Sequence, residues 1–132
     1  MSIRRGNHTV YTINYHFLWC PRYRNAMLGK IESSLERSIR RVAERYGYDV
    51  LSLHIAPDHV HLFLSAHPKH APSEIARTVK SITAREKWEQ HESLLVREFW
   101  SGGFWERSFY VGTTEEISSV TVERYINRTE HV

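Results

Sequence analysis

The sequence has a single cysteine and no long run of apolar residues. Cys20 cannot form a disulfide within the chain, which fits a reducing cytosol, although a secreted domain without disulfides would look the same. No stretch approaches the ~18 consecutive apolar residues of a membrane-spanning helix. Arg4 and Arg5 make the N-terminus basic, but no apolar run of signal-peptide length follows them. We therefore expect a soluble, cytoplasmic protein.

The chain also lacks linkers, repeats and low-complexity tracts. Its 132 residues fit one compact domain, 1–132, which should bury about two-thirds of the surface of the unfolded chain. Hydrophobic residues make up 41% and charged residues 25%, as in globular proteins. Lys and Arg total 18 against 15 acidic residues, a net charge of +3. This balance permits a phosphate-bearing partner but does not demand one.

Periodic patterns in the first half predict two kinds of element. Apolar and polar residues alternate over residues 9–19, which predicts a strand with one buried face. Over residues 30–46 the apolar residues recur every three or four positions, which predicts an amphipathic helix, and Gly47 follows where a left-handed C-cap is expected. Residues 48–55 and 59–66 alternate again and predict two strands of a hairpin.

The second half predicts two further helices and one strand. Ser73 can cap a helix that reaches about residue 90, and an aromatic strand is expected over residues 104–111. Thr113 and Glu116 have the spacing of a capping box and begin a last helix. The whole order predicts an α+β fold, a ferredoxin-like (RRM-like) βαββαβ sandwich with an extra C-terminal helix.

A His-x-His pattern lies on the predicted strand 59–66. Alternation along a strand sends Val60 and Leu62 to one face, and His59 and His61 to the other. The apolar residues belong to the core, whereas the two imidazoles project side by side, with backbones ~6.6 Å apart, and can converge on one divalent cation. A lone His-x-His is a weak signal, because without further support it is more often two surface histidines on a half-exposed strand.

Tyr125 lies on the predicted C-terminal helix. The other six tyrosines have simpler structural explanations, because they lie in strands, beside a helix cap or in a basic loop. Tyr125 is therefore the tyrosine that could carry chemistry, although a single tyrosine on an amphipathic helix more often packs its ring against the domain.

Basic residues form two groups that could contact nucleic acid. Arginine neutralises phosphates, and aromatic rings can stack on unpaired bases at ~1–3 kcal/mol each. Solvated helix faces carry similar charges, so this pattern alone does not establish DNA binding. The groups are Arg22, Tyr23 and Arg24 in the first loop, and Arg77, Lys80 and Arg85 on the second predicted helix.

Four segments in order resemble the small single-strand DNA transposases of bacterial and archaeal insertion sequences. These are single-tyrosine members of the His-hydrophobic-His (HUH) endonuclease superfamily. The resemblance extends over nearly the whole chain, from about His8 to Arg128. The matching segments are the His-x-His stretch Pro57–Leu62, the helix Ser73–Glu86, the glycine turn and strand Trp100–Thr113, and Tyr125–Ile126.

The resemblance implies a function and a role for each candidate residue. Such transposases are homodimers that bind DNA hairpins near the element ends and excise the element as a single-stranded circle. His59 and His61 would hold Mg²⁺ or Mn²⁺ beneath the scissile phosphate. Tyr125 would be the nucleophile, giving a 5′-phosphotyrosine bond and a free 3′-OH. In this family the tyrosine helix typically completes the active site of the partner subunit.

One residue departs from the family pattern. A glutamine usually stands one helical turn after the tyrosine as the third protein ligand, and here that residue is Thr129. Glu130, His131 or water could take the place instead. The departure keeps open an alternative function, an inactive or domesticated relative that binds hairpin DNA without cleaving it. An unrelated module for RNA or a metabolite is disfavoured, because the open sheet face would carry His59 and His61 rather than a dedicated aromatic platform.

Overall fold

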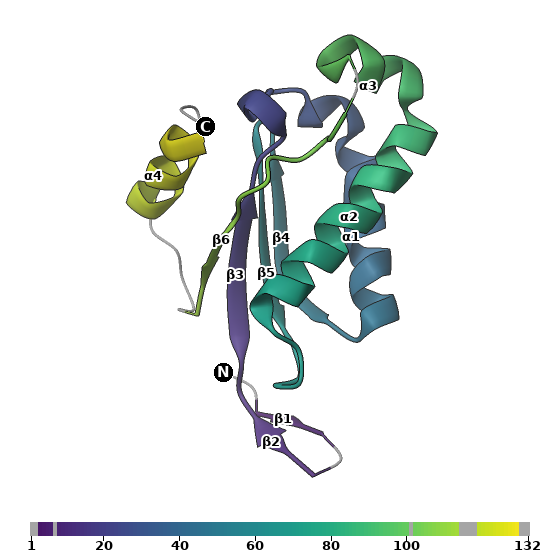
Figure 1. The fold of residues 1–132 in the computed structure, drawn as a ribbon. Coiled ribbons are helices and arrows are strands. Elements are labelled where there is room, and N and C mark those ends of the chain that lie inside the picture. The colour runs from purple at the N-terminus through teal and green to yellow at the C-terminus, as the bar shows by residue number, and fades with distance from the viewer. Residues whose placement is uncertain (1–2, 7, 101, 114–118, 130–132) are drawn as a thin grey trace.

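A four-stranded antiparallel sheet is the centre of the computed structural model, which describes residues 3–6, 8–100, 102–113 and 119–129. The strands lie in the order β4-β5-β3-β6 (Figure 1). They are β3 (Asn14–Trp19), β4 (Asp49–Ala56), β5 (His59–Ser65) and β6 (Tyr110–Gly112). The predicted α+β class is confirmed.

Helices lie on both sides of this sheet. α1 (Glu32–Tyr46) and α2 (Pro72–Gln90) pack on one face, where the main core forms. α4 (Ser119–Thr129) lies on the opposite side (Figure 1) and packs over a separate small cluster. A short helix, α3 (Glu92–Phe99), follows α2. None of the helices within the described ranges is long and apolar enough to cross a membrane.

The first predicted strand is divided in two. Its start, β2 (Val10–Tyr11), pairs with β1 (Arg4–Arg5) in a hairpin that projects from the domain (Figure 1). The rest is β3, and both of its faces are buried, so the expectation of one buried face is wrong. Phe17 faces the main core, whereas Leu18 is covered from the other side by α4. A helix that returns from the C-terminus buries the second face, and a local pattern cannot register it.

The first long helix forms as predicted. It is preceded by a 3₁₀ turn, η2 (Leu28–Ile31), and its buried residues Leu35, Ile39 and Val42 recur at helical spacing. Gly47 adopts the left-handed conformation with φ 79°, and its N–H caps the helix end.

The start of α2 differs from the expectation. Ala71 takes the cap position and Pro72 the first turn, so Ser73 lies inside the helix rather than at its cap. Proline suits the first turn because that residue needs no N–H partner within the helix.

Two other strands are less regular than their patterns suggest. In β4 a bulge between Val50 and Ser52 takes Leu51 out of register and leaves it 41% exposed. The aromatic stretch before β6 is not a continuous strand. Trp105 makes one isolated bridge to Pro21, and its ring is buried in the core. Glu116, the expected partner in the capping box of the last helix, falls outside the described residues.

Candidate active site

The His-x-His pair lies on the sheet face away from α1 and α2. Val60 and Leu62 on the same strand are fully buried in the main core, so strand alternation directs His59 and His61 to the other face. The turn between β4 and β5 immediately precedes His59, which places the pair near one end of the sheet.

His59 is held by a carboxylate. Its Nδ1 lies 2.9 Å from Oδ1 of Asp58, and Oδ2 of Asp58 lies 3.6 Å from Nε of Arg24. A carboxylate only accepts, so Nδ1 of His59 carries the proton, and the lone pair of the neutral ring lies on Nε2. This is the arrangement in which a histidine is oriented to bind a metal through its other nitrogen.

His61 is held by another histidine. Its Nε2 lies 2.8 Å from Nδ1 of His16, which projects from the neighbouring strand β3. Burial, together with the nearby His16, His59 and His54, lowers the pKa of His61 to about 4. His61 is therefore neutral at pH 7, the form in which an imidazole can bind a metal.

Tyr125 reaches the histidine face from α4. Its side chain is 7% exposed and packs against Leu18 and Cys20 of the same chain. Leu18 is paired with His61 in the register of β3 and β5, so the tyrosine covers the strand residue directly beside that histidine. The phenol oxygen lies 3.1 Å from Oγ of Ser108. The fold thus brings Tyr125 close to the His-x-His strand within one chain.

The first basic group lies beside His59. Arg22, Tyr23 and Arg24 form the 3₁₀ turn η1 (Arg22–Arg24), against which α4 packs. The guanidinium of Arg22 lies over the ring of Tyr23, and the tyrosine itself is 71% exposed. Through Arg24 and Asp58 this turn is linked to the His-x-His strand. An exposed aromatic ring next to arginines is typical of a surface that binds unpaired bases.

The family of transposases described as IS200-like matches residues 9–129. The chain belongs to the IS200-like transposases. Its relatives include the ISDra2 transposase TnpA of Deinococcus radiodurans, which is 31% identical over 127 residues, covering 96% of this chain and 90% of that protein. The transposase of insertion sequence IS200 from Salmonella typhimurium is 26% identical over 120 residues, covering 90% of this chain and 78% of that protein.

Solved structures agree with this assignment. A crystal structure from Deinococcus radiodurans R1, described as a transposase, matches with a TM-score of 0.86 and 28% identity, covering 96% of this chain and 97% of that chain. A REP-associated tyrosine transposase bound to a REP hairpin matches with a TM-score of 0.56, covering 99% of this chain and 74% of that chain. At 16% identity the second match shows a shared fold.

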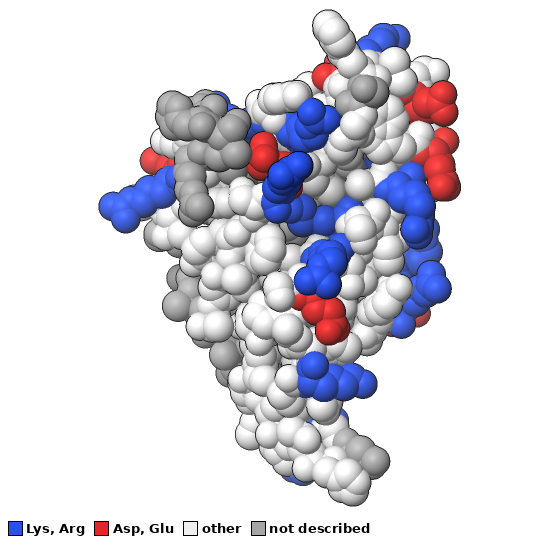
Figure 2. All heavy atoms as spheres, in the orientation of Figure 1, with Lys and Arg blue, Asp and Glu red and all other residues white. Residues whose placement is uncertain are grey.

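The three residues of the second basic group of the transposase do not share one role. Arg77 and Arg85 are exposed on α2, and basic side chains gather over this helix in Figure 2. Lys80 differs. Its Nζ donates to the carbonyls of Glu106, Arg107 and Ser108 at 2.7, 3.2 and 3.0 Å, and burial lowers its pKa to about 8.

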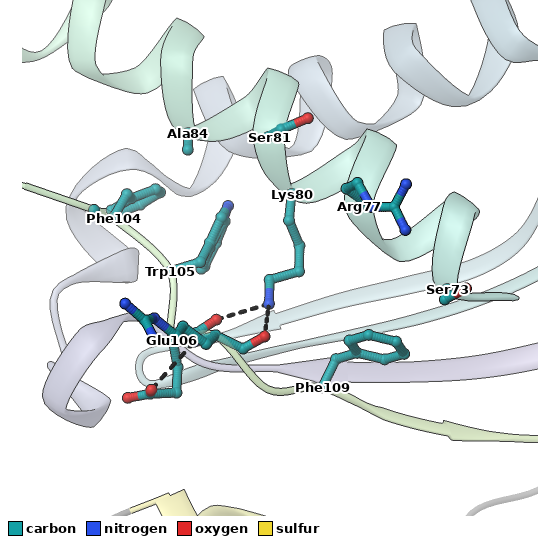
Figure 3. Close-up of a pocket in the computed structure, with 11 residues that line it drawn as sticks. Ser73, Arg77, Lys80, Ser81, Ala84, Phe104, Trp105, Glu106 and Phe109 are labelled. Carbon is teal, nitrogen blue, oxygen red and sulfur yellow. Dashed lines mark hydrogen bonds between the residues drawn. The ribbon is translucent and has the colours of Figure 1, made fainter. Parts of the chain in front are cut away.

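Lys80 therefore fixes the loop before β6 instead of presenting its ammonium to solvent, as Figure 3 shows. A hollow of about 410 Å³ lies between α2 and this loop, and Figure 3 draws the residues that line it. Arg77 lies at its edge, and Trp105 and Phe109 contribute aromatic walls.

The described part of the transposase supplies two of the expected metal ligands. The side chain of Thr129, and all of Glu130 and His131, lie outside it. Within the described ranges no three His, Cys, Asp or Glu side chains are grouped closely enough to hold a metal ion. His59 and His61 nevertheless fit a hydrated divalent cation chemically, because each has one ring nitrogen engaged by a neighbour and a second nitrogen for a ligand bond.

Three residues of the site were not identified in the sequence analysis. Asp58, His16 and Ser108 contact His59, His61 and Tyr125 respectively. The proximity of Asp58 to His59 in the chain was a usable signal. His16 and Ser108 are brought in only by strand pairing and by the return of α4, which no local pattern reveals.

Proposed function

We propose that this transposase binds DNA hairpins at insertion-sequence ends, and cleaves and rejoins single-stranded DNA through Tyr125. The observation that carries the proposal is the packing of Tyr125 on Leu18, the strand neighbour of His61. A nucleophile candidate and two metal-ligand candidates from distant parts of the sequence thereby share one face of the sheet.

The reaction follows from the chemistry of a phenol. The oxygen of Tyr125 attacks the phosphorus and loses its proton to solvent. The bond from phosphorus to the 3′ oxygen breaks, and that oxygen takes up a proton. The product is a 5′-phosphotyrosine with a free 3′-OH. Because one phosphodiester replaces another, a 3′-OH can attack in the reverse direction and rejoin the strand without ATP.

A phenol with a pKa near 10 is a poor nucleophile at pH 7. Mg²⁺ or Mn²⁺ held by His59 and His61 would polarise the phosphate and offset the charge on the leaving oxygen. The third protein ligand in this proposal is Thr129, with Glu130, His131 or water as the alternatives. Ser108 orients the phenol through its hydroxyl, and Asp58 orients His59.

The basic surfaces would hold the DNA. Arg22, Tyr23 and Arg24 lie beside His59, where a single strand would enter the site. Arg77 and Arg85 on α2 offer exposed charges for the phosphates of a hairpin. Lys80 contributes indirectly, through the loop that it holds. DNA as the substrate implies a cytoplasmic protein.

Two further features belong to this proposal. The strand order β4-β5-β3-β6, with α1 and α2 on one face, supports a ferredoxin-like (RRM-like) classification. The family resemblance supports a homodimer in which the tyrosine helix is shared between subunits, whereas α4 is docked on its own chain in this structure.

A covalent-adduct assay tests the function. The purified protein is incubated with Mn²⁺ and a labelled single-stranded oligonucleotide that carries a hairpin, and the denatured sample is examined for protein that retains label. Tyr125→Phe should bind the oligonucleotide and form no adduct. Tyr110 and Tyr125 line one small hollow beside α4, and the control Tyr110→Phe should still form the adduct. An adduct in the Tyr125→Phe protein would exclude this nucleophile.

The residue Thr129 favours one alternative, a hairpin-DNA-binding relative without cleavage activity, because threonine stands where the family usually has glutamine. The same assay separates the two functions. Hairpin binding by the wild-type protein with no adduct in Mn²⁺ or Mg²⁺ would establish the binding function in place of the enzyme.

A further inference from the structure

His16 is held rigidly on the histidine face of the sheet. It is only 4% exposed. Its ring stacks on Phe63 of β5, with ring centroids 4.1 Å apart and an interplanar angle of 15°. Its Nδ1 lies 2.8 Å from Nε2 of His61. Both neighbours come from the adjacent strand, so the register of β3 and β5 fixes the contact.

When both imidazoles are neutral, this contact constrains which ring nitrogen of each carries the proton. One nitrogen of a neutral ring donates and the other accepts. If Nδ1 of His16 donates, Nε2 of His61 accepts and the proton of His61 lies on Nδ1, which leaves His61 no lone pair for a cation. If Nε2 of His61 donates, its Nδ1 keeps a lone pair. The hydrogen bond and metal binding by His61 are therefore compatible in one tautomer only.

We propose that His16 is a positioning residue that accepts the Nε2–H of His61 and thereby leaves Nδ1 of His61 as the metal-binding nitrogen. The inference rests on the proposed role of His61 as a metal ligand. His59 shows the same principle with a different partner, since Asp58 accepts its Nδ1–H and leaves Nε2. The two ligands would thus bind through different ring nitrogens, each fixed by its own acceptor.

The tautomer of His61 gives a test that requires no metal and no DNA. Nitrogen chemical shifts of the ¹⁵N-histidine-labelled, metal-free protein distinguish an Nε2–H ring from an Nδ1–H ring. We expect the Nε2–H form for His61, identified by comparison with the spectrum of His61→Gln. An Nδ1–H form would overturn the proposal.

Two variants of His16 give a second test. His16→Asn keeps an acceptor oxygen near the place of Nδ1, whereas His16→Phe keeps a ring that can stack on Phe63 but has no acceptor. The Mn²⁺ affinity of each full-length protein is measured by titration, with its melting temperature as a check of folding. We expect His16→Phe to bind Mn²⁺ about 10–100-fold more weakly, the usual effect of losing such a partner, and His16→Asn to remain close to wild type.

The outcomes separate this inference from the proposed function. Undiminished Mn²⁺ binding by His61→Ala would refute the metal role of His61 itself. Loss of binding in His61→Ala with wild-type affinity in His16→Phe would refute only the role of His16. Equal weakening in the Asn and Phe variants would also refute it, because an acceptor oxygen would then be no substitute for the imidazole.

Discussion

Ser108 joins the loop before β6 to the candidate nucleophile, since its hydroxyl lies 3.1 Å from the phenol oxygen of Tyr125. The same residue is anchored from the other side of the sheet, where Nζ of Lys80 donates to its carbonyl. A helix of the main core is thus connected through one loop residue to the phenol on α4. This connection makes the orientation of Tyr125 sensitive to residues that need not touch DNA.

Replacing Ser108 with alanine should slow the reaction without abolishing it. The phenol loses one hydrogen bond worth about 1 kcal/mol, which corresponds to roughly a fivefold lower rate of adduct formation. Single-turnover formation of the covalent adduct measures this rate. Ser81→Ala is the control, because Ser81 is an exposed serine of α2 that bonds within its own helix. Equal rates for the two variants would show that Ser108 does not orient the phenol.

Lys80 and Arg77 should respond differently to the same substitution. Lys80→Met leaves three carbonyls without their donor and should lower the free energy of unfolding by about 1–3 kcal/mol. Arg77→Met removes an equal charge from an exposed residue of the same helix, so stability should change by less than about 0.5 kcal/mol. Denaturant unfolding measures the change in the free energy of unfolding for both variants.

DNA binding provides the complementary measurement for Arg77. Its loss should weaken hairpin binding uniformly across sequences and reduce the dependence of log affinity on log salt by about 1. A salt titration of hairpin binding tests this. An unchanged slope in Arg77→Met would remove this arginine from the DNA surface.

Asp58 should matter for metal affinity more than other carboxylates of the chain. Asp58→Ala removes the acceptor that fixes the tautomer of His59, and Mn²⁺ binding should weaken about 10–100-fold. Asp49→Ala is a matched control, because Asp49 is paired with Arg4 next to the projecting hairpin. Titration with Mn²⁺ measures the affinity of both variants, and equal affinities would contradict the role of Asp58 in orienting His59.

Stability of the metal-free protein should fall in mild acid because of His61. Its folded-state pKa of about 4 lies below the ordinary histidine value of 6.5, so the unfolded chain binds more protons between these two pH values. The contribution of His61 to the free energy of unfolding is fully present above pH 6.5 and is lost as the pH falls toward 4. His61→Gln should show a shallower decline of the free energy of unfolding over this window in EDTA. The same pH dependence of the free energy of unfolding in both proteins would contradict the lowered pKa of His61.

The sequence predicted what depends on local periodicity. The helix that ends at Gly47, and the division of β5 into a core face and a histidine face, follow from spacing alone because each period reflects burial on one side of an element. The resemblance to the transposases supplied the family and the expected role of Tyr125. Four motifs in one order are specific, although each motif alone is weak.

What the sequence did not predict depends on contacts between distant residues. His16 is one of the polar residues in the alternating stretch 9–19, and only the pairing of β3 with β5 brings it against His61. Lys80 had the appearance of a solvated helix lysine, and its partners lie 26 to 28 residues further along the chain. The second buried face of β3 likewise exists only because α4 returns to cover Leu18.

Helix α4 is bound to the domain through a cluster of its own. Tyr125 packs on Leu18 and Cys20, and this group is separate from the core that α1 and α2 build on the other face. Lifting α4 away would expose a few side chains, at a cost on the order of a few kcal/mol, and would leave the sheet and its main core folded. The proposed nucleophile Tyr125 therefore lies on a helix whose undocking would be an equilibrium distinct from the unfolding of the domain.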